Sequence, residues 1–156
     1  MATHMNKRAL EMMRKVWAVD HAMRRLSRAM EHNIGISSPH RLIIRVVGER
    51  PGISASALAD LLFLDASTLT EHLKHLEEAD VIKRHTAEED GRRTEITLTA
   101  KGRKLDVKMP GTMEAAVENA LDRSDEKRVA HVEAFLLQLV TELDAQTTLP
   151  KPKRRR

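Results

Sequence analysis

The stretch SASALADLLFLDASTLTEHLKHLEEADVIKRHTAEEDGRRTEITLT, residues 54–99, contains two short helical patterns followed by a hairpin pattern. Ser54 and Asp65 are good N-cap residues, and each directly precedes a run of helical spacing, Ala55–Leu62 and Ala66–Glu78. Only two residues separate the first run from Asp65. Two short helices joined by so tight a turn are typical of a helix-turn-helix.

Both runs have an apolar face. On the first run we expect the inward side chains to be Leu58, Leu61 and Leu62. On the second, the side chains that fall on one side of a helical wheel are Leu69, Leu73 and Leu76. The pattern therefore predicts that the two helices pack on a common core.

The opposite side of the second helix is polar. It carries Ser67, Thr70, Glu71, Lys74 and His75, with Thr68 at its edge. Hydroxyls contact phosphates or base edges, an ammonium reaches phosphate or guanine, and a carboxylate accepts from cytosine. A solvated helix face is the alternative, but the preceding helix and the following hairpin favour a recognition helix in the major groove of DNA.

Residues rich in β-branched side chains follow, in the runs Val81–Thr86 and Thr94–Leu98, with a polar turn containing Asp90 between them. This pattern predicts a β-hairpin wing with a charged tip. At the tip, Arg92 and Arg93 would reach an adjacent minor groove, and Asp90 would orient one of them through a charge-assisted hydrogen bond. An ordinary charged turn is the alternative.

Before this stretch, residues 6–34 show the spacing of one long helix with an apolar stripe. A second helix is expected to begin with Ser38 as its cap and Pro39 in its first turn. Its buried stripe is predicted to be Leu42, Ile43, Val46 and Val47.

After the hairpin, Thr99 is expected to cap a helix that runs to about Leu121 with a kink at Pro110-Gly111. Ser124 is expected to cap the last helix. The apolar face of that helix is predicted to be Val129, Val132, Phe135, Leu136, Leu139, Val140 and Leu143. From about Gln146 the chain is polar and basic, and we expect residues 146–156 to form a disordered tail.

Composition narrows the function. The chain has no cysteine, which excludes disulfides and thiolate metal sites, and no apolar run as long as a membrane span, so we expect a cytoplasmic protein without membrane partners. Without the five basic residues of the tail, the rest of the chain carries 22 basic and 23 acidic residues. Any nucleic-acid binding must therefore rest on local charge.

Catalysis and metal binding find no support in the motifs. The sequence has no nucleophile elbow, no phosphate-binding glycine loop and no cluster of metal ligands, so we expect no enzyme activity, no catalytic residue and no cofactor. His72 and His75 are three residues apart, but without a third ligand nearby we interpret them as packing or DNA-facing histidines.

The order of these motifs resembles the MarR family, the multiple antibiotic resistance regulators, over about residues 10–145. The most specific part is the wing, where Asp90, Arg92, Leu98-Thr99 and Gly102 match the family's pattern. Asp80 stands where the family often has glycine, and an aspartate can adopt the left-handed conformation there at some cost.

The resemblance implies a mainly helical winged helix-turn-helix protein with a small β-hairpin wing and an α-helical dimerisation platform. Residues 36–99 would form the DNA-binding domain, and residues 6–34 and 100–145 the platform of a homodimer. The family's DNA contacts would fall on Ser67, Thr68, Thr70, Glu71, Lys74 and His75, on Arg92 with its partner Asp90, and on Ser54 and Ser56 as phosphate contacts.

The expected function is therefore a transcription regulator, favoured to be a repressor, that binds a pseudo-palindromic site in double-stranded DNA as a homodimer. A winged helix that acts through a protein partner is the alternative. Family members commonly bind small aromatic anions beside the DNA-binding domain, and the candidate residues for such an effector here are Trp17, His21, His40 and Arg45.

Overall fold

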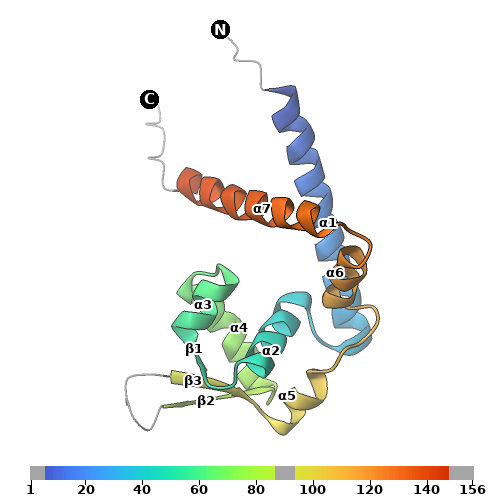
Figure 1. The fold of residues 1–156 in the computed structure, drawn as a ribbon. Coiled ribbons are helices and arrows are strands. Elements are labelled where there is room, and N and C mark those ends of the chain that lie inside the picture. The colour runs from blue at the N-terminus through green and yellow to red at the C-terminus, as the bar shows by residue number, and fades with distance from the viewer. Residues whose placement is uncertain (1–5, 87–93, 148–156) are drawn as a thin grey trace, which may run out of the picture. The chain divides into compact units, whose positions relative to one another are not determined.

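The computed structural model describes residues 6–86 and 94–147 (Figure 1). The chain divides into two compact units, residues 1–115 and residues 116–156. The first unit contains α1 (Lys7–Ile34), α2 (Ser38–Glu49), β1 (Ile53–Ser54), α3 (Ala55–Leu62), α4 (Ala66–Glu78), β2 (Ile82–Thr86), β3 (Thr94–Leu98) and α5 (Ala100–Leu105). Helix α6 (Met113–Leu121) begins in the first unit and ends in the second, which also contains α7 (Glu126–Thr147).

The predicted hairpin is confirmed and belongs to a sheet of three antiparallel strands in the order β1-β3-β2. Ile82 pairs with Leu98 and Arg84 with Ile96, while Ile53 of β1 pairs with Ile96 from the other side. The sequence did not predict β1, because a strand of two residues is too short to produce an alternating pattern. Helices α2, α3 and α4 gather beside this sheet, which is the arrangement of a winged helix (Figure 1).

The core of the first unit lies between α2, α3, α4 and the sheet. Its buried side chains are Ile43, Ile44, Val47, Leu58, Ala59, Leu69, Leu73, Leu76, Val81, Ile82, Ile96 and Leu98. Two predicted core residues are wrong: Leu42 is 54% exposed and Leu61 is 38% exposed. The buried stripes are turned by about one residue, so that Ile44 and Ala59 take the inward positions instead.

The helix predicted from Thr99 to about Leu121 with a kink is two separate helices. Thr99 caps α5 as expected, through its hydroxyl and the Gly102 amide at 3.0 Å, but α5 ends at Leu105. Two constraints account for the break. Pro110 has no amide proton to donate and Gly111 has a φ of +75°, so the connecting segment cannot continue as a helix.

Two predicted caps are displaced by one residue. Ser37 is the N-cap residue of α2, while the Ser38 amide donates to the Ser27 hydroxyl at 2.9 Å. At the start of α7 the Asp125 carboxylate accepts from the Arg128 amide at 3.1 Å, whereas Ser124 donates its hydroxyl proton backwards to the Ala120 carbonyl. By contrast, the left-handed conformation expected at Asp80 is confirmed, with a φ of +56°.

Most of the large apolar side chains on the first and last helices are exposed in the single chain, although Met30 of α1 is buried. Trp17 on α1 is 76% exposed, and neither α6 nor α7 contains a buried residue among those that the structure describes. Helix α7 continues to Thr147, so the tail predicted from residue 146 begins no earlier than residue 148, outside the described residues. None of the described helices is long and apolar enough to cross a lipid bilayer.

Candidate nucleic-acid interface

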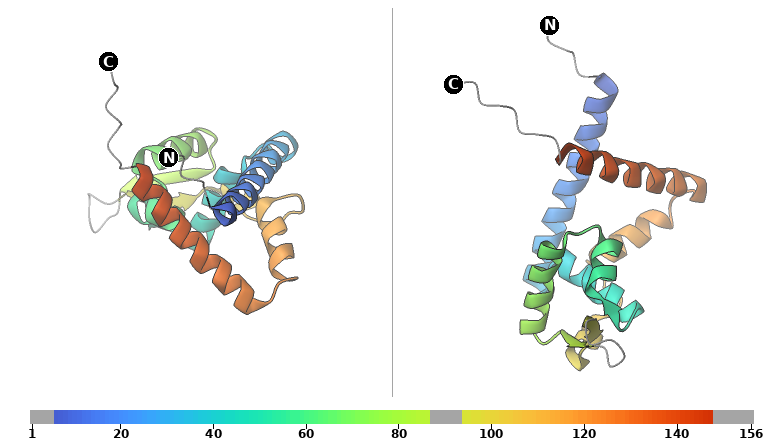
Figure 2. Two further views of the ribbon diagram at one scale, coloured as in Figure 1. Left: turned by 90° about the horizontal axis from the view of Figure 1, so that it is seen from above. Right: turned by 90° about the vertical axis from the view of Figure 1, so that its left-hand side faces the viewer.

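Helix α4 is held against the core by its leucines. Leu69, Leu73 and Leu76 are all buried, as the sequence predicted. The helix follows α3 after a turn in which Phe63, although it is not glycine, adopts a left-handed φ of +53°. The right-hand view of Figure 2 shows α3 and α4 as two short helices that meet at this turn. Because one face of α4 is fixed by burial, the opposite face has a defined orientation.

That opposite face is the predicted one. The exposed side chains are Ser67, Thr70, Glu71, Lys74 and His75, and Thr68 is half-buried at the edge. The structure thus brings all six predicted α4 residues to one accessible surface. Their contacts with DNA stay a prediction.

Asp65 organises the first turn of α4. Its carboxylate accepts from the Thr68 amide at 2.8 Å and the Thr68 hydroxyl at 2.7 Å, and also from the Ser67 hydroxyl. The Ser67 hydrogen bond is the largest of the causes that hold the pKa of Asp65 well below its usual range, so the group is ionised at neutral pH. Since Ser67 and Thr68 donate their protons to Asp65, their oxygen lone pairs remain available as acceptors.

Further along the helix, the Thr70 hydroxyl donates to the Ala66 carbonyl at 2.6 Å. Lys74 lies 3.8 Å from Glu78 in an exposed i,i+4 pair, which is weak enough to leave the ammonium available to another anion. His75 uses Nδ1 against the Glu71 carbonyl at 2.9 Å, which directs Nε2 away from the helix backbone. The surface therefore offers hydroxyl acceptors at one end and a cation with an imidazole at the other.

The two serines before and within α3 differ. Ser54 is buried and its hydroxyl accepts from the Ala57 amide at 3.2 Å, so the structure uses it as the predicted cap. Ser56 is exposed and its hydroxyl lies 3.2 Å from that of Ser54. Of the two predicted phosphate contacts, only Ser56 presents its hydroxyl at the surface.

An ion pair that the sequence did not reveal joins the wing to the recognition helix. Arg84 of β2 donates to the Glu77 carboxylate of α4 through Nε at 2.9 Å, and through a second nitrogen as well. This bond lowers the pKa of Glu77 and raises the pKa of Arg84. The partners are seven positions apart across a turn, so no helical or strand period marks them in advance. The predicted wing-tip residues Asp90, Arg92 and Arg93 lie outside the described residues.

The four candidate effector residues lie on two helices, α1 and α2. Trp17 and His21 are exposed on α1, His40 contacts the histidines of α4, and Arg45 pairs with Asp106 beyond α5. An open hollow of about 430 Å³ lies instead where α1 meets the start of α2 and Met113. It is lined by Asp20, Met23, Arg24, Ser27, Arg28, Ser38, Pro39 and Met113.

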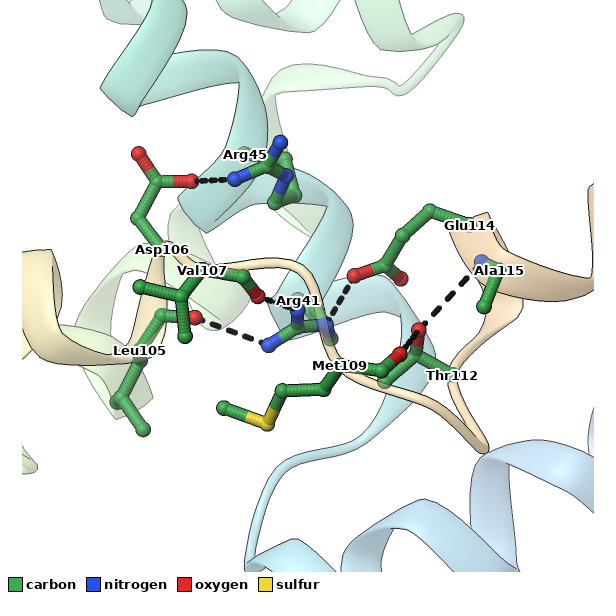
Figure 3. A network of polar contacts seen from close by, with 9 residues as sticks. All are labelled: Arg41, Arg45, Leu105, Asp106, Val107, Met109, Thr112, Glu114 and Ala115. Atoms are coloured by element: carbon green, nitrogen blue, oxygen red, sulfur yellow. Dashed lines mark hydrogen bonds and ion pairs between the residues drawn. The ribbon is translucent and has the colours of Figure 1, made fainter. Parts of the chain in front are cut away.

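A buried arginine connects α2 to the segment between α5 and α6 (Figure 3). Arg41 of α2 is only 1% exposed and donates to the Leu105 carbonyl at 2.9 Å, to the Val107 carbonyl at 2.6 Å, and to the Glu114 carboxylate. Nearby, Arg45 pairs with Asp106. These contacts satisfy carbonyls that a continuous helix would have used, which explains why the sequence pattern alone was misleading here.

No group of three histidine, aspartate or glutamate side chains in residues 6–86 and 94–147 has a geometry that would hold a metal ion. His72 is half-buried and contacts His40, while His75 is exposed on the predicted DNA face. The arrangement fits the packing and DNA-facing interpretation of these histidines.

The chain has two short helices, one of which exposes a polar face, followed by a three-stranded sheet. This arrangement is that of a winged helix-turn-helix protein. The comparisons agree. The family model described as the MarR family matches residues 34–93. The organic hydroperoxide resistance transcriptional regulator of Bacillus subtilis is 30% identical over 101 residues, which are 63% of this chain and 69% of that protein.

The chain belongs to the MarR family of transcriptional regulators. It is also similar to the HTH-type transcriptional regulator TtmR of Methylorubrum extorquens, with 37% identity over 94 residues, 60% of this chain but only 48% of that relative's length. A Streptococcus pneumoniae regulator, FabT, solved in complex with DNA, has the same fold, with a TM-score of 0.63 and 24% identity over 90% of this chain and 98% of that one.

Proposed function

We propose that this chain is a repressor that binds a specific site in double-stranded DNA by placing α4 in the major groove. The main observation behind this proposal is that α4 has two different faces. One face is fixed in the core by three buried leucines, and the other exposes hydroxyls, Lys74 and His75. In this proposal the α4 side chains read base edges and the wing arginines Arg92 and Arg93 contact the backbone or minor groove. This polar face, which carries Lys74 and His75, favours DNA over a protein partner, for which an apolar or acidic face would be expected.

The same proposal includes a homodimer. Large apolar side chains are exposed on α1, α6 and α7, among them Met13, Trp17, Val117, Phe135 and Leu136. Exposed apolar surface of this extent marks an interaction site. A second copy of the chain would cover it, so that residues 6–34 and 100–145 form the platform and residues 36–99 carry the DNA-binding surface.

A two-fold dimer predicts the symmetry of its own DNA site. Selection of duplexes from a random library by the purified protein should enrich an inverted repeat, with half-sites centred about 10 base pairs apart or a multiple of that. Sedimentation of the complex should give two chains per duplex. Enrichment of a single unrepeated site bound by one chain would contradict the dimer, and no enrichment at all would contradict the DNA-binding proposal.

We further propose that a small aromatic anion regulates this binding from the hollow beside α1 and α2. Arg24 is already paired with Asp20 at 2.9 Å, whereas Arg28 makes no ion pair with the residues that the structure describes. An arginine beside the thioether side chains Met23 and Met113 suits a carboxylate attached to an aromatic ring.

Arg28→Ala should weaken binding of salicylate, a representative aromatic carboxylate, by about tenfold, which corresponds to one lost charge-assisted contact. Isothermal titration calorimetry measures this directly. Arg25→Ala, an exposed arginine of α1 that does not line the hollow, is the matched control. Equal affinity in the native chain and the Arg28 variant would place any effector elsewhere, with Trp17, His21, His40 and Arg45 as the next residues to test.

A further inference from the structure

Three histidines meet behind the recognition helix. The His40 ring of α2 lies edge-on to the His72 ring of α4, with centroids 5.1 Å apart and planes at 86°, and 5.9 Å from the His75 ring. His40 is half-buried, and its Nε2 atom is fully buried without a hydrogen-bond partner among the described residues. The contact of α2 with α4 at His72 and His75 therefore runs through an imidazole whose buried Nε2 has no hydrogen-bond partner among the described residues.

We propose that His40 is a proton-sensitive contact that holds α4 in its DNA-binding position only while the imidazole is neutral. The proposal concerns regulation and rests on the proposed DNA-binding function. Protonation would place a positive charge in a half-buried site whose ring lies within 6 Å of two further imidazole rings. Separation of α2 from α4 relieves the cost of that charge, and it also disturbs the surface that carries Lys74 and His75.

The surroundings of His40 favour the neutral form of its imidazole. Burial lowers the pKa of His40, and the neighbouring His72 and His75 lower it further, whereas Glu31 near the end of α1 acts in the opposite sense. Because the folded-state pKa lies below the ordinary value of 6.5, the unfolded chain binds the proton more readily. The stabilising contact is fully present above pH 6.5 and is lost as the pH falls below that value.

A competing effect has the opposite sign. Protons taken up elsewhere on the protein in acid add positive charge, which strengthens binding to phosphates. A variant without a titratable group at position 40 experiences only this second effect. The contribution of His40 is therefore the difference in the pH dependence of DNA affinity between the native chain and that variant. The pH dependence of the native chain alone does not measure it.

The first test needs no DNA. In the full chain, the ring nitrogens followed by NMR through a pH titration should show His40 titrating below 6.5, the ordinary value for histidine. Titration of His40 at or above 6.5 would overturn the proposal whatever the protein binds.

The second test measures DNA affinity at about pH 7.5 and about pH 5.5. Acid should weaken binding by the native chain at least about fivefold more than binding by His40→Phe, which keeps a ring but cannot titrate. His40→Gln serves if the phenylalanine variant does not fold. His131→Gln, on the polar side of α7, should behave like the native chain. An equal pH response in the native chain and the position-40 variants would overturn the proposal, and absence of binding at both pH values would overturn the proposed function with it.

Discussion

Arg41→Ala is expected to lower the free energy of unfolding by about 3–5 kcal/mol, the cost of breaking a buried ion pair by removing one partner. Arg41 is 1% exposed, and its guanidinium is the donor for two carbonyls and one carboxylate. Its loss leaves the Leu105 and Val107 carbonyls without their donor and leaves Glu114 without its cation. A loss of this size is a large part of the total stability of a small domain.

Urea unfolding of the two proteins side by side measures the loss. Arg45→Ala is the matched control, because Arg45 stands one helical turn away on α2 and pairs with Asp106 while it remains 34% exposed. Solvent screens that pair, so its removal should cost about 1 kcal/mol or less. If Arg41→Ala cost no more than Arg45→Ala, the contacts in Figure 3 would not be what holds the segment between α5 and α6.

Lys74→Glu is expected to weaken DNA binding by about 100-fold at physiological salt, because it removes a phosphate contact and places a like charge against the duplex. The exposed position of Lys74 means that the fold should be preserved. The salt dependence of the affinity should also become shallower, since fewer counterions are released. Fluorescence anisotropy over a range of salt concentrations measures both quantities.

The control for Lys74→Glu is Glu78→Gln, which removes the i,i+4 partner of Lys74 and leaves the lysine charge in place. Binding by this variant should be unchanged or slightly tighter. A comparable loss in both variants would assign the effect to helix stability and would remove Lys74 from the DNA contacts.

Local chemistry made much of this fold predictable. The caps at Ser54, Asp65 and Thr99, the leucine face of α4 and the left-handed Asp80 all follow from side chains that act within a few residues of themselves. One of the errors also involves long-range contacts. Arg41 reaches residues 64 or more positions away, and these contacts hold the segment that separates α5 from α6 where one helix was expected from Thr99 to Leu121.

The candidate site was also predictable only in part, as far as it depends on residues close together in the sequence. Helical period alone assigned the exposed face of α4, since burial of one face determines the other. The ion pair between Glu77 and Arg84 and the three-histidine contact depend on how α2, α4 and β2 pack together, which no sequence period records. None of the four candidate effector residues lines the hollow beside α1 and α2, because a hollow is formed by the crossing of helices and its lining shares no period along the chain.

The most direct test is fluorescence anisotropy of the purified protein on duplex DNA from upstream of its own coding sequence, beside a scrambled duplex of the same composition. At physiological salt the native chain should bind the upstream duplex at least about 1,000-fold more tightly than the scrambled one, as two chains per site, and Lys74→Glu should reduce that binding. Equal and weak binding of both duplexes, unaffected by Lys74→Glu, would contradict a regulator that recognises this DNA through α4.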